Sequence, residues 1–395
     1  MNPLKVKDIL YTQEHLCNPF EYRDGISDTP ISIRDQRVSI IVKSIFIGLL
    51  TLGIGGVIAF YYFTAQHKVT RYNEYLRKTV GNKPIVKINV DKESFWKEFK
   101  ILDFLKTLRI TDHYHFVISN KPDFVFYSVF TPGNYKNGTW STPQLKGDFK
   151  SIFICGENVK PDMTKCDWAF SFTHDEDINN QRHFRLPLYK YQFDISSLEK
   201  RKIDAETISK IKKNKTKFCN FIYSAENPFR NKFFDKLNKY KPVDAPGKAR
   251  NNMPPIGHHK DALLARKAKD WAQEKQDFLD SYKFTIAFEN TSAKGYTTEK
   301  IVGPMERDSI PIYWGNPQIE KDFNGKSFIH LKPEEYALDE DQQIDLLVKK
   351  VIEIDQNDDR YEAYLKEPWF PGNKPTKYSD NKVILQQFRK IFAGA

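Results

Sequence analysis

The chain begins with a polar stretch, contains one long apolar run, and then alternates short apolar runs with amphipathic ones. Residues 1–37 are polar and aperiodic, which predicts a loosely ordered tail. Residues 44–65 include 22 positions without a charged side chain. At about 1.5 Å per residue this run spans the hydrocarbon core of a bilayer. Aromatic residues at positions 61–63 would form an interfacial belt. We therefore expect a transmembrane helix over 38–65 and a stalk over 66–83.

After the stalk, strand-like and helix-like segments alternate. Short apolar runs predict strands over 84–90, 123–130, 151–155, 168–172, 284–288 and 310–314. Amphipathic stretches predict helices over 95–108, 261–281 and 341–354. Strands that alternate with helices are typical of the α/β class with parallel sheets. A polar, lysine-rich stretch over 194–216 then separates two apolar sets, so we predict domains over 84–210 and 211–368. Residues 369–395 form either a C-terminal tail or a returning helix.

Composition narrows the choice of partners. The chain has 62 Lys and Arg against 51 Asp and Glu, a net charge of +11, which favours anionic partners. The basic residues are spread along the whole chain and no nucleic-acid module is recognisable, so no nucleic-acid partner is expected. The four cysteines form no Cys-x-x-Cys pair, so a structural zinc site is not expected either.

The richest chemistry lies in one segment, Lys283–Lys300. An apolar strand leads into polar Glu289 and Asn290, then a small-residue loop, and residues 297–300 are expected to open a helix. Polar groups at the carboxyl end of a strand, beside a helix N-terminus, make a natural phosphate site. Lys300 would add a positive charge toward a diphosphate, and Tyr296 would pack against a sugar or a base.

This segment resembles the α-1,3-fucosyltransferases of glycosyltransferase family 10. The resemblance is carried by Phe-Glu-Asn…Gly-Tyr-x-Thr-Glu-Lys and a downstream Ile-Pro-Ile-Tyr-Trp-Gly-x-Pro. Three further blocks follow the same family order, at Cys155–Asn158, Arg185–Tyr189 and Asn227–Phe234. The resemblance implies a GT-B fold, in which two Rossmann-like domains face a cleft, with the acceptor on the N-terminal domain and GDP-fucose on the C-terminal one. It implies an inverting transfer that requires no cofactor and no metal.

The resemblance also implies roles for individual residues. Glu157 is the general base that takes the proton of the attacking hydroxyl. Arg230 clamps the diphosphate with its planar fork of donors, and Lys300 neutralises the leaving group. Glu299 stabilises the cationic sugar or holds its hydroxyls. Each role has a purely structural alternative. Glu157 would then bond backbone amides in a turn, Arg230 would lie on a solvated helix face, and Glu299 and Lys300 would form an ordinary helix pair.

The resemblance implies broader roles for four further residues of the site. Asn290 and Tyr296 are donor or nucleotide contacts. Arg182 and Arg185 either orient the Glu157 region or form interdomain salt bridges. The resemblance implies an N-acetyllactosamine-type oligosaccharide as acceptor, attacked at O3 of N-acetylglucosamine; attack through a 4-hydroxyl or on a glucose residue stays open.

Two alternatives remain open at this stage. Asp175 and Asp177 form an Asp-x-Asp after a predicted strand, the arrangement with which GT-A glycosyltransferases hold a divalent metal on a diphosphate. A catalytically inactive, membrane-tethered carbohydrate-binding protein is the other alternative.

The sequence gives little information on which side of the membrane the catalytic domain lies. Three basic residues precede the apolar run (Arg34, Arg37 and Lys43) and four follow it closely, so the positive-inside rule does not decide. Glycosylation sequons begin at Asn137, Asn214 and Asn290. A glycan on Asn290 would block the nucleotide site. We therefore expect a single-pass membrane protein whose catalytic domain is cytoplasmic rather than lumenal.

Overall fold

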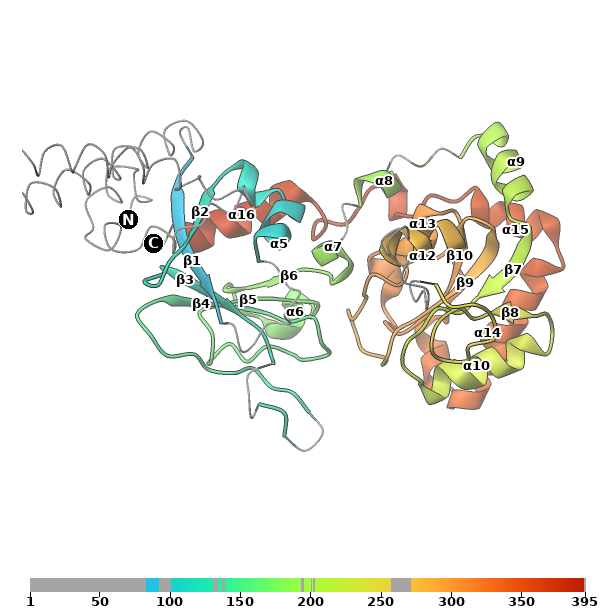
Figure 1. Cartoon of the computed structure of the whole chain (residues 1–395), viewed down its shortest axis with the longest axis horizontal. Coiled ribbons are helices and arrows are strands. Elements are labelled where there is room, and N and C mark those ends of the chain that lie inside the picture. The colour runs from blue at the N-terminus through green and yellow to red at the C-terminus, as the bar shows by residue number, and fades with distance from the viewer. Residues whose placement is uncertain are drawn as a thin grey trace, which may run out of the picture. The chain divides into compact units, whose positions relative to one another are not determined.

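A computed structural model describes residues 83–91, 101–130, 134–136, 139–192, 195–199, 201, 203–256 and 271–393 (Figure 1). The predicted membrane segment 38–65 lies outside the described residues, as do the tail and nearly all of the stalk. Among the described residues, no helix has both the length and the apolar character needed to cross a bilayer.

The contacts divide the chain into two compact units. The first takes the described parts of Met1–Cys155, Pro161–Phe170 and Ile384–Ala395. The second takes Gly156–Lys160 and the described parts of Ser171–Val383. The short Gly156–Lys160 segment, which contains Glu157, therefore belongs to the second unit although it directly follows a strand of the first.

The first sheet has the strand order β2-β1-β3-β4-β5-β6, and its pairs from β2 to β5 are parallel. The strands are β1 (Ile85–Val90), β2 (His115–Ile118), β3 (Phe124–Tyr127), β4 (Lys150–Ile154), β5 (Trp168–Ser171) and β6 (His183–Arg185). Helix α5 (Ile101–Thr107) lies in the connection from β1 to β2, as a parallel pair requires. The sequence predicted β1, β3, β4 and β5 within three residues at each end, but neither β2 nor β6.

The last helix returns to this first unit. Helix α16 spans Asn381–Phe392 (Figure 1). Its Phe388 ring stacks on Phe170 of β5 at 4.9 Å, and its Phe392 ring meets Phe124 of β3 edge-on at 5.1 Å. The structure thus has a returning helix rather than a tail, because the amphipathic helix covers the aromatic face of the first sheet.

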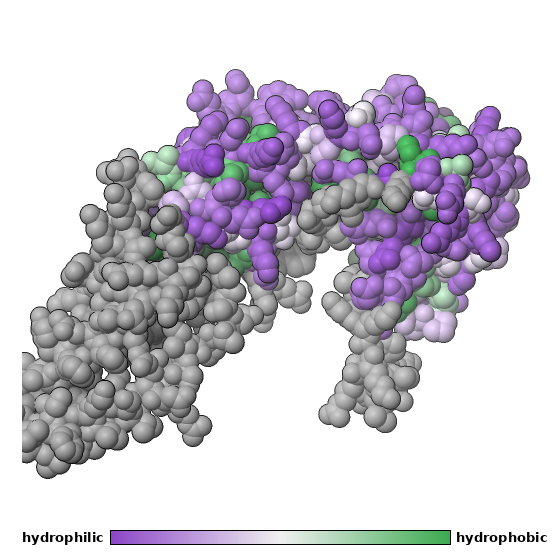
Figure 2. Space-filling view, turned by 90° about the horizontal axis from the view of Figure 1, so that it is seen from above, coloured by the Kyte–Doolittle hydropathy of each residue, from purple (hydrophilic) through white to green (hydrophobic). Residues whose placement is uncertain are grey.

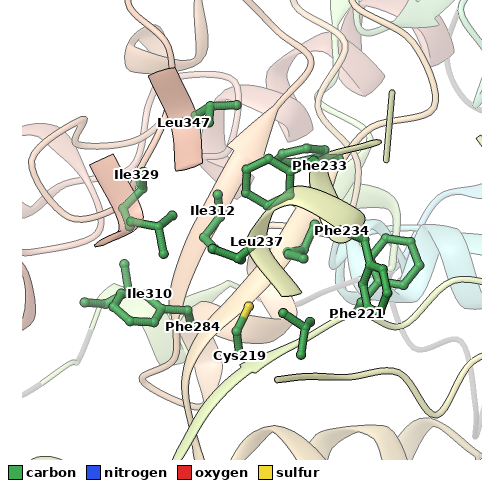
Figure 3. Packing of buried hydrophobic residues seen from close by; sticks show 14 of the residues in the cluster. Cys219, Phe221, Phe233, Phe234, Leu237, Phe284, Ile310, Ile312, Ile329 and Leu347 are labelled. Carbon is green, nitrogen blue, oxygen red and sulfur yellow. The ribbon is translucent and has the colours of Figure 1, made fainter. Parts of the chain in front are cut away.

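The second sheet is fully parallel, with the order β10-β9-β7-β8. Its strands are β7 (Lys217–Asn220), β8 (Val243–Asp244), β9 (Tyr282–Phe288) and β10 (Ile310–Trp314). The flanking helices include α9 (Ala205–Asn214), α10 (Pro228–Asn238), α12 (Trp271–Leu279), α13 (Val302–Glu306), α14 (Glu340–Asp355) and α15 (Asp358–Leu365). Figure 3 shows the core, in which phenylalanines and a leucine of α10 meet the apolar side chains of the strands and Leu347 of α14.

One predicted helix start is wrong. Residues 297 and 298 have no regular secondary structure, residues 299 and 300 lie in a turn, and α13 begins only at Val302 and has five residues. The Thr298 amide and hydroxyl donate to the Glu289 side chain, so this segment is held at the end of β9. The predicted phosphate site therefore does not use a helix beginning at Thr297.

The surface of the described residues is polar. In the view of Figure 2 hydrophilic residues dominate it and hydrophobic residues form small patches. The three described cysteines, Cys155, Cys166 and Cys219, are buried and free.

Candidate functional site

The carboxyl ends of the second sheet position most of the predicted site residues. Because the strands are parallel, their carboxyl ends lie on one edge, where open α/β sheets bind ligands. Glu289 and Asn290 directly follow β9. Gly315 follows β10, and a Cβ built on it would lie 2.5 Å from the Glu289 side chain. The two strand ends are therefore packed closely together at Glu289.

Arg230 is held against the end of β9 from the first turn of α10. Asn227 caps this helix by accepting a hydrogen bond from the Arg230 amide (3.1 Å), and Pro228 occupies its first position. The guanidinium lies 4.2 Å over the Tyr223 ring, and its Nη2 donates to the Phe288 carbonyl at 3.0 Å. Arg230 is 5% exposed.

The Arg230 guanidinium has unused hydrogen-bonding capacity. Its buried Nε has no hydrogen-bond partner among the described residues. A buried guanidinium N–H without an acceptor costs free energy, so a position with this geometry fits an anionic ligand. The N-terminus of α10, an 11-residue helix, adds its partial positive charge at the same place.

Lys300 is anchored to the same strand end by Glu289. The Lys300 ammonium lies 3.2 Å from Glu289 Oε2, 2.8 Å from Thr298 Oγ1 and 3.8 Å from Glu299 Oε1. Its side chain keeps 23% of its surface exposed, whereas the Glu289 side chain has none. Lys300 is therefore a fixed cation that still reaches solvent.

Tyr296 lies among the acidic residues of the site. Its ring meets Phe172 edge-on at 5.1 Å, and it is 3% exposed. Burial raises the pKa of the Tyr296 hydroxyl, as do the charges of Glu289, Glu157 and Glu299, in that order, while a hydrogen bond with the Asn290 side chain lowers it. The predicted residues Glu157 and Glu299 thus act electrostatically on the Tyr296 hydroxyl, and Asn290 bonds it.

Glu157 lies in the turn that follows β4. The Val159 amide donates to the Glu157 carbonyl at 2.7 Å, which fixes the turn, and the side chain is half-buried. Burial raises the pKa of the Glu157 carboxyl above its usual value, and the Lys300 cation lowers it. A half-buried carboxyl with a raised pKa beside a lysine suits a general base.

The two supporting arginines have different surroundings. Arg185 is 1% exposed and forms a bidentate pair with Asp322, at 2.7 and 2.6 Å. Its Nε donates to the carbonyl of Phe172, the residue on which Tyr296 packs. Both partners of this pair lie in the second unit, where they support Tyr296 through Phe172. Arg182 is exposed.

The sequence reasoning missed two residues of this site. Glu289 was read only as a polar strand end, although it carries the hydrogen bonds that hold Lys300. Lys275 of α12 is the other: burial lowers the pKa of its ammonium, Glu299 raises it and Lys300 lowers it, so this half-buried lysine lies near both. No local signal marks either residue, because their place in the site comes from tertiary packing.

The Asp-x-Asp alternative loses its support in the structure. Asp175 and Asp177 lie on α6 (Asp175–Ile178), and positions two apart on a helix do not face each other. Asp175 is already engaged, accepting from the Arg185 amide at 2.7 Å and lying 3.0 Å from His183 Nδ1. Within the described ranges, no group of three His, Cys, Asp or Glu residues could hold a metal ion.

Known proteins resemble both halves of this architecture. Residues 211–385 match the family "Glycosyltransferase family 10 (fucosyltransferase) C-term". Residues 90–192 match "Alpha-(1,3)-fucosyltransferase FucT N-terminal domain".

Individual relatives agree with the family matches. An alpha-(1,3)-fucosyltransferase of Helicobacter pylori is 31% identical over 270 residues, which are 60% of this chain and 51% of that protein. A putative fucosyltransferase of Acanthamoeba polyphaga mimivirus is 35% identical over 205 residues, 51% of this chain and 32% of that one. This chain therefore spans about half or less of the length of these relatives.

Solved structures share the fold over most of the chain. The crystal structure of an alpha1,3-fucosyltransferase with GDP has a TM-score of 0.59 and 25% identity, and covers 79% of this chain and 92% of its own. A structure of an alpha1,3-fucosyltransferase with GDP-fucose covers the same shares, with a TM-score of 0.58 and 25% identity. The parallel sheets, the five ordered sequence blocks and these matches together place the chain in glycosyltransferase family 10, the fucosyltransferases.

Proposed function

We propose that this protein transfers L-fucose from GDP-fucose to a hydroxyl of an acceptor glycan with inversion at the sugar carbon. The observation that carries the proposal is that two cationic side chains are held at the carboxyl end of β9: Arg230, whose guanidinium donates to the Phe288 carbonyl, and Lys300, whose ammonium is anchored on Glu289. The Lys300 charge also acts on the half-buried Glu157 carboxyl, which supports Glu157 as the base for a nucleotide sugar bound there. The similar solved structures include complexes with GDP and with GDP-fucose, which supports the choice of donor.

The proposed reaction is a single displacement. The acceptor oxygen forms a bond to the anomeric carbon of fucose while the bond from that carbon to the diphosphate oxygen breaks. Glu157 takes the hydroxyl proton, and the electron pair of the broken bond leaves with GDP. Arg230 and Lys300 balance the negative charge that develops on the diphosphate, and Glu299 faces the positive charge on the sugar. Asn290 and Tyr296 hold the donor.

We also propose an acceptor and a location for the enzyme. We propose an N-acetyllactosamine-type oligosaccharide attacked at O3 of N-acetylglucosamine; the name of the family that matches the N-terminal part supports the 1,3 linkage. We keep the proposal of a membrane-anchored enzyme with residues 44–65 as the anchor and a cytoplasmic catalytic domain. We propose that Arg230 and Lys300 meet the charge of the diphosphate, so that the transfer requires no metal.

The test is a transfer assay with the whole chain in detergent. The protein is incubated with GDP-fucose and N-acetyllactosamine, with and without EDTA, and the product is analysed for its linkage and anomeric configuration. The proposal expects an α-1,3-linked fucose product at a rate that EDTA leaves within twofold. A β-linked product would contradict inversion, and a rate abolished by EDTA would favour a metal-dependent transfer. Tight GDP-fucose binding without any product from a panel of acceptors would favour the carbohydrate-binding alternative.

A further inference from the structure

A fully buried carboxylate directly follows β9 and is shared by a threonine and a lysine. Glu289 Oε1 accepts from the Thr298 amide at 2.7 Å, and Oε2 accepts from the Thr298 hydroxyl at 2.7 Å and from the Lys300 ammonium at 3.2 Å. The Thr298 hydroxyl in turn accepts from Lys300 at 2.8 Å. The Glu289 carboxylate, the Thr298 hydroxyl and the Lys300 ammonium are therefore each hydrogen-bonded to the other two.

The shape of the strand ends fixes this carboxylate. Gly315, at φ +152°, packs so closely on Glu289 that a Cβ there would approach its side-chain carbons to 2.5 and 2.7 Å. The Glu289 side chain is completely buried, and burial raises the pKa of its carboxyl while Lys300 lowers it. A carboxylate that is both buried and sterically confined holds its partners in one place.

The geometry leaves one Lys300 proton for another acceptor. A lysine ammonium has three donors, and Glu289 and Thr298 take two of them. Glu299 lies 3.8 Å away, beyond hydrogen-bond length. A mobile lysine side chain loses rotamer entropy when it is fixed on a ligand. An ammonium that is already fixed has less of this entropy to lose on meeting a phosphate.

We propose that Glu289 is a positioning residue of the donor site: through Thr298 it fixes the Lys300 ammonium so that its remaining N–H faces a phosphate of the nucleotide sugar. This proposal rests on the donor assignment made above and adds the residue that organises it. Glu289 does not touch the reacting atoms and acts only through Lys300.

Substitution of Glu289 would change GDP affinity through two opposing effects, so the direction of the change tests the proposal. Removing the negative charge of Glu289 should, by Coulomb attraction alone, strengthen the binding of an anionic nucleotide. Loss of the anchor should instead weaken it, because Lys300 becomes mobile. Glu289→Gln keeps the shape that Gly315 packs on, so its effect on GDP affinity separates the two.

The experiment measures GDP affinity by calorimetry for wild type, Glu289→Gln, Lys300→Met and the double variant. The proposal expects Glu289→Gln to weaken GDP binding at least tenfold and to cause no further weakening in the Lys300→Met background. Unchanged or stronger GDP binding by Glu289→Gln would overturn it. An equal weakening in both backgrounds would also overturn it, because the effect would then not pass through Lys300.

A matched control separates positioning from general destabilisation. Asp355 is another buried carboxylate of the same unit; its side chain is 2% exposed, and it bonds Lys283, Lys241 and Tyr240 at the opposite end of β9. Asp355→Asn should lower the melting temperature while leaving GDP affinity within twofold. A comparable loss of GDP affinity in this control would assign the Glu289→Gln effect to stability.

A second pair of variants serves if Glu289→Gln does not fold. Thr298→Val removes the hydroxyl that bridges Glu289 and Lys300, and Thr298→Ser keeps it. The valine variant should weaken GDP binding severalfold and the serine variant less than twofold; equal effects would overturn the proposal. A wild-type protein that binds no GDP would instead refute the donor assignment itself, so the two failures are distinguishable.

Discussion

The Lys300 cation lowers the pKa of the Glu157 carboxyl, against the larger effect of burial, which raises it. These two residues are 143 positions apart in the sequence, yet both belong to the second unit. Lys300, which we propose binds the leaving diphosphate, therefore also lowers the pKa of the proposed base, Glu157.

The pH profile of activity should respond to this coupling. A base works only when deprotonated, so kcat/KM falls as the pH drops below the pKa of Glu157. Lys300→Gln removes a charge that lowers this pKa, and the acid limb of the profile should move to higher pH. Lys300→Arg keeps the charge and should leave the limb near its wild-type position. The check is the residual kcat/KM of each variant from pH 4 to 8; an unmoved limb in Lys300→Gln would disprove the coupling.

Arg230 should be needed for its fork of donors as well as for its charge. Arg230→Lys keeps the charge but lacks the planar guanidinium, which can donate to the Phe288 carbonyl and to a phosphate at the same time. We expect GDP binding to weaken about tenfold or more, roughly 1.4 kcal/mol. Arg360→Lys is the control, because Arg360 lies on α15 with 58% of its side chain exposed. Equal GDP affinities for all three proteins would remove Arg230 from the diphosphate site.

The buried Arg185–Asp322 pair should matter for stability far more than a surface pair. Asp322→Asn leaves the Arg185 guanidinium buried without a countercharge, which costs about 3–5 kcal/mol. Glu353→Gln breaks the exposed pair with Arg360 and should cost about 0–1 kcal/mol. Urea unfolding followed by fluorescence measures both. Similar midpoints for the two variants would contradict the assigned role of the pair.

Lys215 should give stability a distinct pH dependence. Its buried ammonium donates to the carbonyls of Leu279, Asp280 and Arg307, and burial lowers its pKa to about 8 from 10.5. Between these two values the unfolded chain holds more protons than the folded one, so the free energy of unfolding rises with pH.

The comparison with Lys215→Met isolates this contribution. The stability advantage of wild type over the variant should grow from pH 8 to pH 10.5 and stay constant below pH 7. Urea titrations of both proteins at several pH values give the difference directly. A constant advantage across the whole range would show that the Lys215 ammonium titrates normally.

Some of this protein could be predicted because the signal is local. Strand β10 was predicted with its observed bounds, since the run Ile310–Trp314 is apolar and is followed by a glycine. Helix α14 was predicted within one residue at each end, because its apolar spacing is regular and Asp339 caps it. The parallel sheets followed from the alternation of such segments.

Other features depend on packing that no local pattern records. The helix expected from Thr297 begins only at Val302, and the Thr298 amide and hydroxyl donate to the buried Glu289 side chain at the end of β9. Glu289 and Lys275 enter the site only through the burial of β9 and α12. The sequence marked Glu157 through its resemblance block, but its raised pKa depends on the folded surroundings.

The most direct test of the central claim is a single-turnover measurement on Glu157→Gln. The variant is mixed with GDP-fucose and acceptor under enzyme excess, and fucose transfer is compared with wild type beside the affinity for GDP-fucose. We predict that transfer falls by about 10²–10⁴-fold, the usual contribution of a positioned base, while donor affinity stays within threefold. Wild-type transfer by the variant would contradict the role of Glu157.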